Sequence, residues 1–143
     1  MLGGVTIPHP TGLGGHSDAD VVTHAVADAV LGAAGLGDIG RLFPDDDPAY
    51  EGADSLALLK EVVARARATG YAVGNVDVVV VCEAPRLASH GALMALNLAR
   101  ALRVTTAQVS VKATTTEGMG YEGRAEGISA TAVCLLIQAE PEI

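Results

Sequence analysis

Residues 16–47 constrain this chain more than any other stretch, because they combine an apolar helix pattern with regularly spaced ionisable side chains. The stretch reads HSDADVVTHAVADAVLGAAGLGDIGRLFPDDD and holds two histidines and seven aspartates of the 143-residue chain. Small apolar side chains recur at helical spacing and predict a helix over residues 20–34, ended by Gly35. Ionisable side chains spaced along such an apolar helix indicate a functional site rather than a solvated helix face. We therefore expect metal-assisted phosphate chemistry here.

Three polar side chains share another face of the predicted helix. Asp20, His24 and Asp28 follow at intervals of four residues, so they lie one turn apart. His24 can be a metal ligand, with the Asp28 carboxylate orienting its second ring nitrogen. A histidine packed in an apolar helix is the alternative. One histidine does not make a catalytic zinc site, which takes three protein ligands.

His16 and Ser17 come just before the expected helix, where free backbone N–H groups favour phosphate. A role for Ser17 or Asp18 as a plain helix cap is equally compatible with the sequence.

Three further segments carry candidate ligands. Residues 45–47, DDD, can bind a sugar hydroxyl or a divalent ion, or form only a solvated acidic loop. Residues 114–117, TTTE, end a strand pattern before a glycine-rich loop, so hydroxyls and backbone N–H groups can hold phosphate while Glu117 holds a hard cation. The β-propensity of threonine is the plain alternative. Residues 83–86, EAPR, leave a strand at an edge where ligands often bind, or form a simple strand exit.

The remaining patterns predict the fold class, α/β, as an α+β sandwich with helices on one side of a mixed β-sheet. The unbroken apolar run of residues 79–82 predicts a strand buried on both faces. At this length, residues 1–143 are expected to form a single domain. The predicted strands cover residues 3–8, 73–85, 109–116 and 128–138, and two further helices cover residues 55–70 and 89–102.

Composition narrows the class of protein. A net charge of −8 argues against a surface for nucleic acid or for an anionic membrane. No apolar run approaches the ~18–20 residues of a membrane helix, and MLGGVTIP does not resemble a signal peptide, so a cytoplasmic protein is expected. Cys82 and Cys134 lie in strand patterns, which favours two reduced thiols over a disulfide. A core with only 3% aromatic residues favours support from oligomer contacts.

Four segments, taken in order, closely resemble the 2-C-methyl-D-erythritol 2,4-cyclodiphosphate synthase family, the cyclases of non-mevalonate isoprenoid biosynthesis. They are GGVTIP, GGHSDADVVTHAVADAVLGAAGLGDIGRLFPDDDPAYEGADS, GYAVGNVDVVVVCEAPRL and VKATTTEGMGYEGRAEGISATAV, and together they cover nearly the whole chain. The resemblance implies a homotrimer around a β-lined axis, with active sites between neighbouring subunits. It implies a phosphorus–oxygen lyase that converts 4-diphosphocytidyl-2-C-methyl-D-erythritol 2-phosphate to the cyclic diphosphate plus CMP.

The resemblance also implies roles for particular residues. His24 would bind zinc, and Glu117 would bind a magnesium or manganese ion that bridges two phosphates. His16 and Thr115 would stabilise the transition state. The substrate would be held at the methylerythritol by Asp38, Ile39, Gly40, Phe43, Pro44, Asp45, Asp46 and Asp47, at the cytosine by Ala84, Pro85, Arg86 and Leu87, and at the phosphates by His16, Ser17, Thr114, Thr115, Thr116, Glu117, Tyr121 and Arg124.

One departure from the family concerns zinc. Family members open with a strand bearing an Asp-x-His pair that supplies two further zinc ligands, whereas this chain begins one strand later, and His9 does not match that pair. The resemblance therefore implies an incomplete zinc site with reduced affinity. A non-catalytic trimer that binds cytidine and isoprenoid phosphates is the alternative function. A metal-dependent phosphohydrolase built on residues 45–47 is a third hypothesis.

Overall fold

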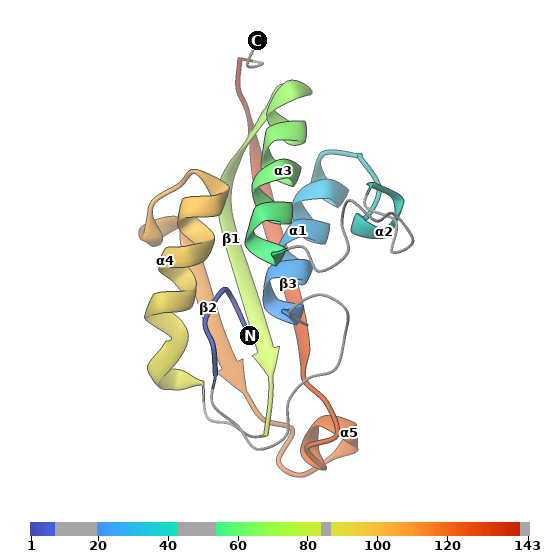
Figure 1. The fold of residues 1–143 in the computed structure, drawn as a ribbon, viewed down its shortest axis with the longest axis vertical. Coiled ribbons are helices and arrows are strands. Elements are labelled where there is room, and N and C mark those ends of the chain that lie inside the picture. Colours follow the sequence, from blue (N-terminus) through green and yellow to red (C-terminus); the bar gives the residue numbers. More distant parts are fainter. Residues whose placement is uncertain (8–19, 43–53, 84–86, 141–143) are drawn as a thin grey trace.

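The computed structural model of the chain describes residues 1–7, 20–42, 54–83 and 87–140. Three helices, α1, α3 and α4, pack against the strands, and the short α5 lies at one end of the molecule while the C-terminus lies at the other (Figure 1). The elements in chain order are α1 (Val21–Ala33), α2 (Ile39–Leu42), α3 (Ser55–Ala68), β1 (Tyr71–Val81), η2 (Ala88–His90), α4 (Gly91–Leu102), η3 (Thr106–Gln108), β2 (Val109–Thr114), α5 (Gly120–Gly123) and β3 (Ser129–Gln138).

The sheet is mixed, as the sequence predicts. Its strand order is β2-β1-β3, so β1 is central. β1 runs parallel to β2, from the pair Val76 and Val109 to the pair Val81 and Thr114. β1 runs antiparallel to β3 over nearly its whole length. Because β1 and β2 are parallel, the segments that follow them leave the sheet at the same edge.

The predicted strand over residues 3–8 is wrong for the part that the structure describes. Residues 1–7 instead form a tight turn, closed by an isolated bridge between Leu2 and Val5. Each of these two residues donates its backbone N–H to the other's carbonyl at 2.8 Å. The turn forms because Gly3 and Gly4 adopt positive φ angles of 53° and 74°, which a strand does not use.

The start of α1 also differs from the prediction. Asp20 itself caps the helix, and its side chain accepts a hydrogen bond from the backbone N–H of Thr23. Ser17 and Asp18, the two predicted caps, lie outside the described residues. The helix then ends at Ala33, one residue before the predicted limit.

Helices cover only one face of the sheet. Val78 and Val80 of β1 are buried against them, whereas Val79 and Val81 on the opposite face are half-buried. The strand predicted to be buried on both faces is thus fully buried on one face and half-buried on the other in the single chain, where no described helix packs on the second face. That face continues onto β3, where Val133, Leu135 and Ile137 are 70%, 63% and 52% exposed.

The helix-covered face contains the core and both cysteines. Cys82 is buried and Cys134 is half-buried, and both are thiols, as predicted. Within the described part of the chain, none of the helices is long and apolar enough to cross a membrane.

Candidate functional site

The carboxyl ends of β1 and β2 bring together two of the segments singled out in the sequence. Val81 pairs with Thr114 at the end of the parallel ladder. One residue further on, Cys82 donates its backbone N–H to the Thr114 carbonyl at 2.9 Å. The chain therefore leaves β1 at Glu83 and β2 at Thr115 side by side, at the carboxyl ends of the strands, where ligands of open α/β sheets bind.

Glu83 joins these two segments through its side chain. One carboxylate oxygen accepts the backbone N–H of Thr116 at 3.3 Å, and the other accepts the backbone N–H of Gly118 at 3.1 Å. These two amides flank Glu117, whose φ of 55° lies in the left-handed region. Non-glycine residues held in that region cluster at functional sites.

The hydroxyl and carboxylate groups of this loop face solvent. Thr114, Thr115 and Glu117 are all exposed. The Thr115 hydroxyl oxygen accepts the backbone N–H of Glu117 at 3.2 Å, which leaves the hydroxyl proton available to a ligand. The Thr116 hydroxyl donates to the Met119 carbonyl and so closes the loop. The loop can present a hydroxyl donor and a carboxylate to a phosphate and its counter-ion.

A second group of candidates lies along α1 and its neighbours. His24 is half-buried, and its Nε2 lies 2.9 Å from the hydroxyl oxygen of Ser55 at the start of α3. Ser55 is completely buried. The predicted Asp28 partner is wrong, because the Asp28 carboxylate accepts the backbone N–H of Ile39 at 2.9 Å instead. Sequence spacing places Asp28 one turn from His24, but the first turn of α2 supplies a backbone donor, which has no partner within its own helix, to the Asp28 carboxylate.

The contact between the Asp28 carboxylate and the Ile39 N–H positions the predicted methylerythritol-binding residues at the start of α2. Asp38 is exposed and accepts the backbone N–H of Arg41 at 2.9 Å, so its carboxylate caps the short helix. Ile39 is half-buried and Gly40 is exposed. The Asp28 and Asp38 carboxylates thus hold the backbone N–H groups of Ile39 and Arg41.

The loop after β2 and the group along α1 differ in how well they can bind a metal ion. Among the residues that the structure describes, no cluster of three His, Cys, Asp or Glu side chains could hold a metal ion. Among the described residues, His24 therefore lacks two further ligands beside it, whereas a catalytic zinc site takes three. Glu117 fits magnesium or manganese better, because such ions commonly bind one or two carboxylates together with substrate phosphates.

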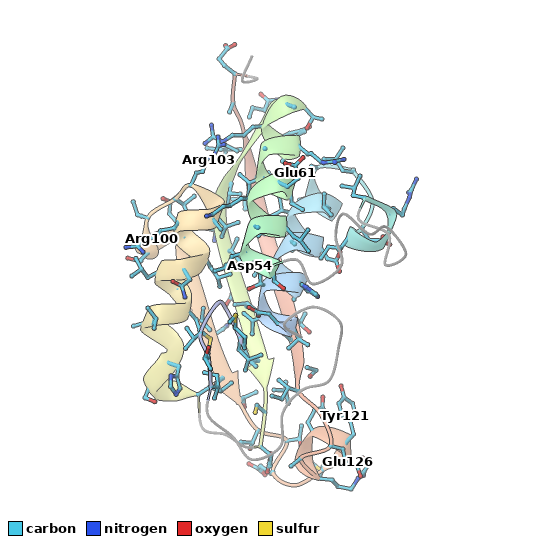
Figure 2. The ribbon with its side chains drawn as sticks, in the orientation of Figure 1. Asp54, Glu61, Arg100, Arg103, Tyr121 and Glu126 are labelled. Carbon is cyan, nitrogen blue, oxygen red and sulfur yellow. The ribbon has the colours of Figure 1, made fainter. Side chains whose placement is uncertain are left out.

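Tyr121 lies in α5 and Arg124 follows that helix as its C-terminal cap. α5 lies at the end of the molecule toward which β1 runs (Figure 1), and Figure 2 labels Tyr121 there. Tyr121 is 47% exposed. The Arg124 guanidinium binds the Glu126 carboxylate through two contacts of 3.0 and 3.2 Å. Both partners are exposed, so a phosphate can compete for the guanidinium.

The sequence did not identify three residues with clear structural roles. Glu83 was placed in a segment that either binds ligands or forms a simple strand exit, and Ser55 was placed only at the start of a helix. Asp20 was placed on a candidate ligand face, although it is fully buried. Leu87 is also buried. Ten of the predicted site residues lie outside the described residues, namely His16, Ser17, Phe43, Pro44, Asp45, Asp46, Asp47, Ala84, Pro85 and Arg86.

Comparisons with known proteins agree with one another. Residues 1–137 match the profile described as the YgbB family. The chain is 58% identical over 139 residues to the 2-C-methyl-D-erythritol 2,4-cyclodiphosphate synthase of Bordetella petrii, covering 97% of this chain and 86% of that protein. Identity to the synthase of Geotalea daltonii is also 58%, over 95% of this chain and 80% of the relative.

Solved structures show the same relationship. The bifunctional IspDF from Campylobacter jejuni is 41% identical with a TM-score of 0.93, and the match covers 98% of this chain and 38% of that protein. IspF of Plasmodium falciparum, in a CDP complex, is 32% identical with a TM-score of 0.85, over 97% of this chain and 83% of the neighbour.

Proposed function

The chain belongs to the YgbB family, and from that membership we propose that it is a lyase that forms 2-C-methyl-D-erythritol 2,4-cyclodiphosphate. The substrate is 4-diphosphocytidyl-2-C-methyl-D-erythritol 2-phosphate, and the second product is CMP. The observation that carries this conclusion is the 58% identity over 139 residues to the synthase of B. petrii. The exposed threonine and glutamate loop beside the end of β1 supports it, because it offers groups that bind a diphosphate.

The reaction needs no nucleophile from the protein. An oxygen of the substrate's 2-phosphate forms a bond to the β-phosphorus, the bond from that phosphorus to the bridging oxygen breaks, and CMP leaves with this oxygen and its electron pair. The tasks left to the protein are positioning and neutralisation of charge. Thr115 is suited to donate its hydroxyl proton to a phosphate oxygen, because its own oxygen already accepts the Glu117 N–H.

Two residues are the candidate metal ligands. Glu117 would hold a magnesium or manganese ion, which supplies positive charge to the diphosphate. His24 is the zinc-ligand candidate on α1, and the neighbouring Ser55 hydroxyl holds its ring in one orientation. The described residues do not complete a zinc site, so we assign zinc no part in the bond-making step.

The remaining parts of the substrate would be bound by other candidate residues. Asp38, Ile39 and Gly40 would hold the methylerythritol, on a segment that Asp28 and Asp38 anchor. The backbone at Leu87 and the residues just before it would bind the cytosine. The P. falciparum IspF structure is a CDP complex, which supports a cytidine site in the family. Tyr121 and Arg124 would bind phosphate at α5.

We also propose a homotrimer with active sites between subunits. The support is the open sheet face, where three apolar side chains of β3 are more than half exposed. Exposed apolar surface of this kind marks an interface. In such a trimer, the loop after β2 of one chain and the α1 and α2 residues of another would together form each site, as the family resemblance implies.

The test is incubation of the protein with the diphosphocytidyl substrate and magnesium. Release of CMP with formation of the cyclic diphosphate, and without inorganic phosphate, is expected. Inorganic phosphate would indicate the hydrolase instead. Binding of CDP by calorimetry without release of CMP would indicate the non-catalytic binding protein.

A further inference from the structure

We propose that Glu83 is a positioning residue that holds Glu117 and Thr115 in the geometry needed to meet the substrate's diphosphate. This inference rests on the proposed function, because it assigns a supporting partner to that site. Glu83 itself touches neither substrate nor metal in this scheme. It acts through the backbone of the loop that follows β2.

The geometry places Glu83 on both sides of the functional residue. Its two carboxylate oxygens accept the N–H groups of Thr116 and Gly118, at 3.3 and 3.1 Å. The Gly118 N–H belongs to the peptide plane that follows Glu117, and the Thr116 N–H lies two peptides earlier, so the two hydrogen bonds hold the chain on either side of Glu117. The peptide plane that precedes Glu117 is held by its own N–H, which the Thr115 hydroxyl oxygen accepts. The Glu117 side chain makes none of these contacts and faces solvent.

The conformation that Glu83 holds is unfavourable on its own. Glu117 has a φ of 55°, where the Cβ of a non-glycine residue crowds the following carbonyl. Such a conformation persists only when its surroundings over-determine it. Gly118, with a φ of 83°, continues the turn without this cost. The hydrogen bonds from two backbone N–H groups to the Glu83 carboxylate help to stabilise this turn, together with the bonds that Thr115 and Thr116 make within it.

A carboxylate at this position has a specific advantage. Both of its oxygens accept, so each can bind one of the two amides. The side-chain amide of glutamine has a single acceptor oxygen, and its NH₂ group would meet the second backbone N–H donor to donor. Glu83→Gln therefore keeps the size of the side chain and loses one of the two hydrogen bonds. Glu83→Ala loses both.

The same contacts connect two parts of the site. Glu83 immediately precedes residues 84–87, the proposed cytosine-binding segment, while Thr115 and Glu117 belong to the proposed phosphate loop. Glu83 lies 33 and 35 residues from its partners in sequence. Its carboxylate thus ties the chain just after β1 to the loop that follows β2.

The experiment compares Glu83→Gln and Glu83→Ala with a matched surface control. Glu61→Gln removes a carboxylate that pairs with Arg65 at 3.1 Å on α3. Glu61 lies well away from the α5 end of the molecule (Figure 2). We expect Glu83→Ala to speed amide hydrogen exchange in the peptide spanning residues 114–119 by about tenfold, because the loop loses both anchors. The exchange rate in Glu83→Gln should lie between the rate in Glu83→Ala and the rate in Glu61→Gln, which should equal that of the unaltered protein.

A second readout separates positioning from a merely structural role. With CDP bound, Mn²⁺ affinity measured by electron paramagnetic resonance should fall by about fivefold or more in Glu83→Ala, since Glu117 is no longer pre-oriented. The value of kcat for CMP release should fall by about tenfold or more, while KM changes less. A purely structural role would lower the melting temperature without changing Mn²⁺ affinity in the folded protein.

Exchange and Mn²⁺ affinity within twofold of the unaltered protein in both variants would overturn the assignment of Glu83. Failure of the unaltered protein to release CMP would overturn the proposed function instead. In that case, the exchange measurement would still decide whether Glu83 holds the loop.

Discussion

The Asp20 carboxylate accepts the backbone N–H of Gly3 at 2.7 Å, across 17 residues of sequence. It also accepts the N–H of Gly4 and both the N–H and the hydroxyl of Thr23. Asp20 is completely buried. One carboxylate therefore caps α1 and ties the turn at residues 2–5 to the first turn of the same helix.

Asp20→Ala should lower the free energy of unfolding by about 3 kcal/mol, since it leaves buried backbone donors without an acceptor. Urea unfolding followed by circular dichroism measures this value. The matched control is Asp54→Ala, which removes an exposed cap of α3 and should cost only about 1 kcal/mol. Equal losses in the two variants would show that the bonds to Gly3 and Gly4 contribute nothing.

Thr115→Ala should reduce kcat for CMP release by about tenfold to a hundredfold, because a hydroxyl donor to the phosphate is lost. Thr115→Ser keeps the hydroxyl and should retain most of the activity. Thr106→Ala, an exposed threonine of η3, is the control and should leave kcat unchanged. Full activity in Thr115→Ala would remove this residue from the mechanism.

Leu135→Asp should dissociate the proposed homotrimer, since it places a charge in the apolar face of β3. Size-exclusion chromatography with light scattering should give about 43 kDa for the unaltered protein, three times the 14.4 kDa chain. The variant should elute as the single chain. Leu93→Asp, on the exposed side of α4, should remain trimeric. A monomeric unaltered protein would contradict the assembly.

Burial raises the pKa of the Cys134 thiol from 9.0 to about 11. The thiol of the unfolded chain ionises first as pH rises, so the stabilising contribution is fully present below pH 9 and is lost between pH 9 and 11. In the Cys82→Ala background, Cys134 should react with iodoacetamide much more slowly at pH 8.5 than the exposed thiol of Ala107→Cys. Similar rates would mean that Cys134 is not desolvated.

Local patterns in the sequence predicted most of the elements. The helices and the strands after residue 54 lie close to their predicted limits, because apolar periodicity and cap residues are read within one turn or one strand. The loop after β2 was also identified as part of the candidate site, because the family motif that it carries is a continuous stretch of sequence. The Gly3 and Gly4 turn was mistaken for a strand, since the apolar residues around it carry no sign of positive φ.

The site depends on contacts that no local pattern contains. Asp28 binds Ile39 rather than His24, and Glu83 reaches the amides beside Glu117, only because of how α2 and the parallel β1 and β2 are placed. The apolar face of β3 is open because the helices pack on one side of the sheet. The sequence by itself determined the elements, the chemical groups and the family. The tertiary structure decided which carboxylate binds which donor, because hydrogen bonds form between neighbours in space and a side chain has few acceptors to offer.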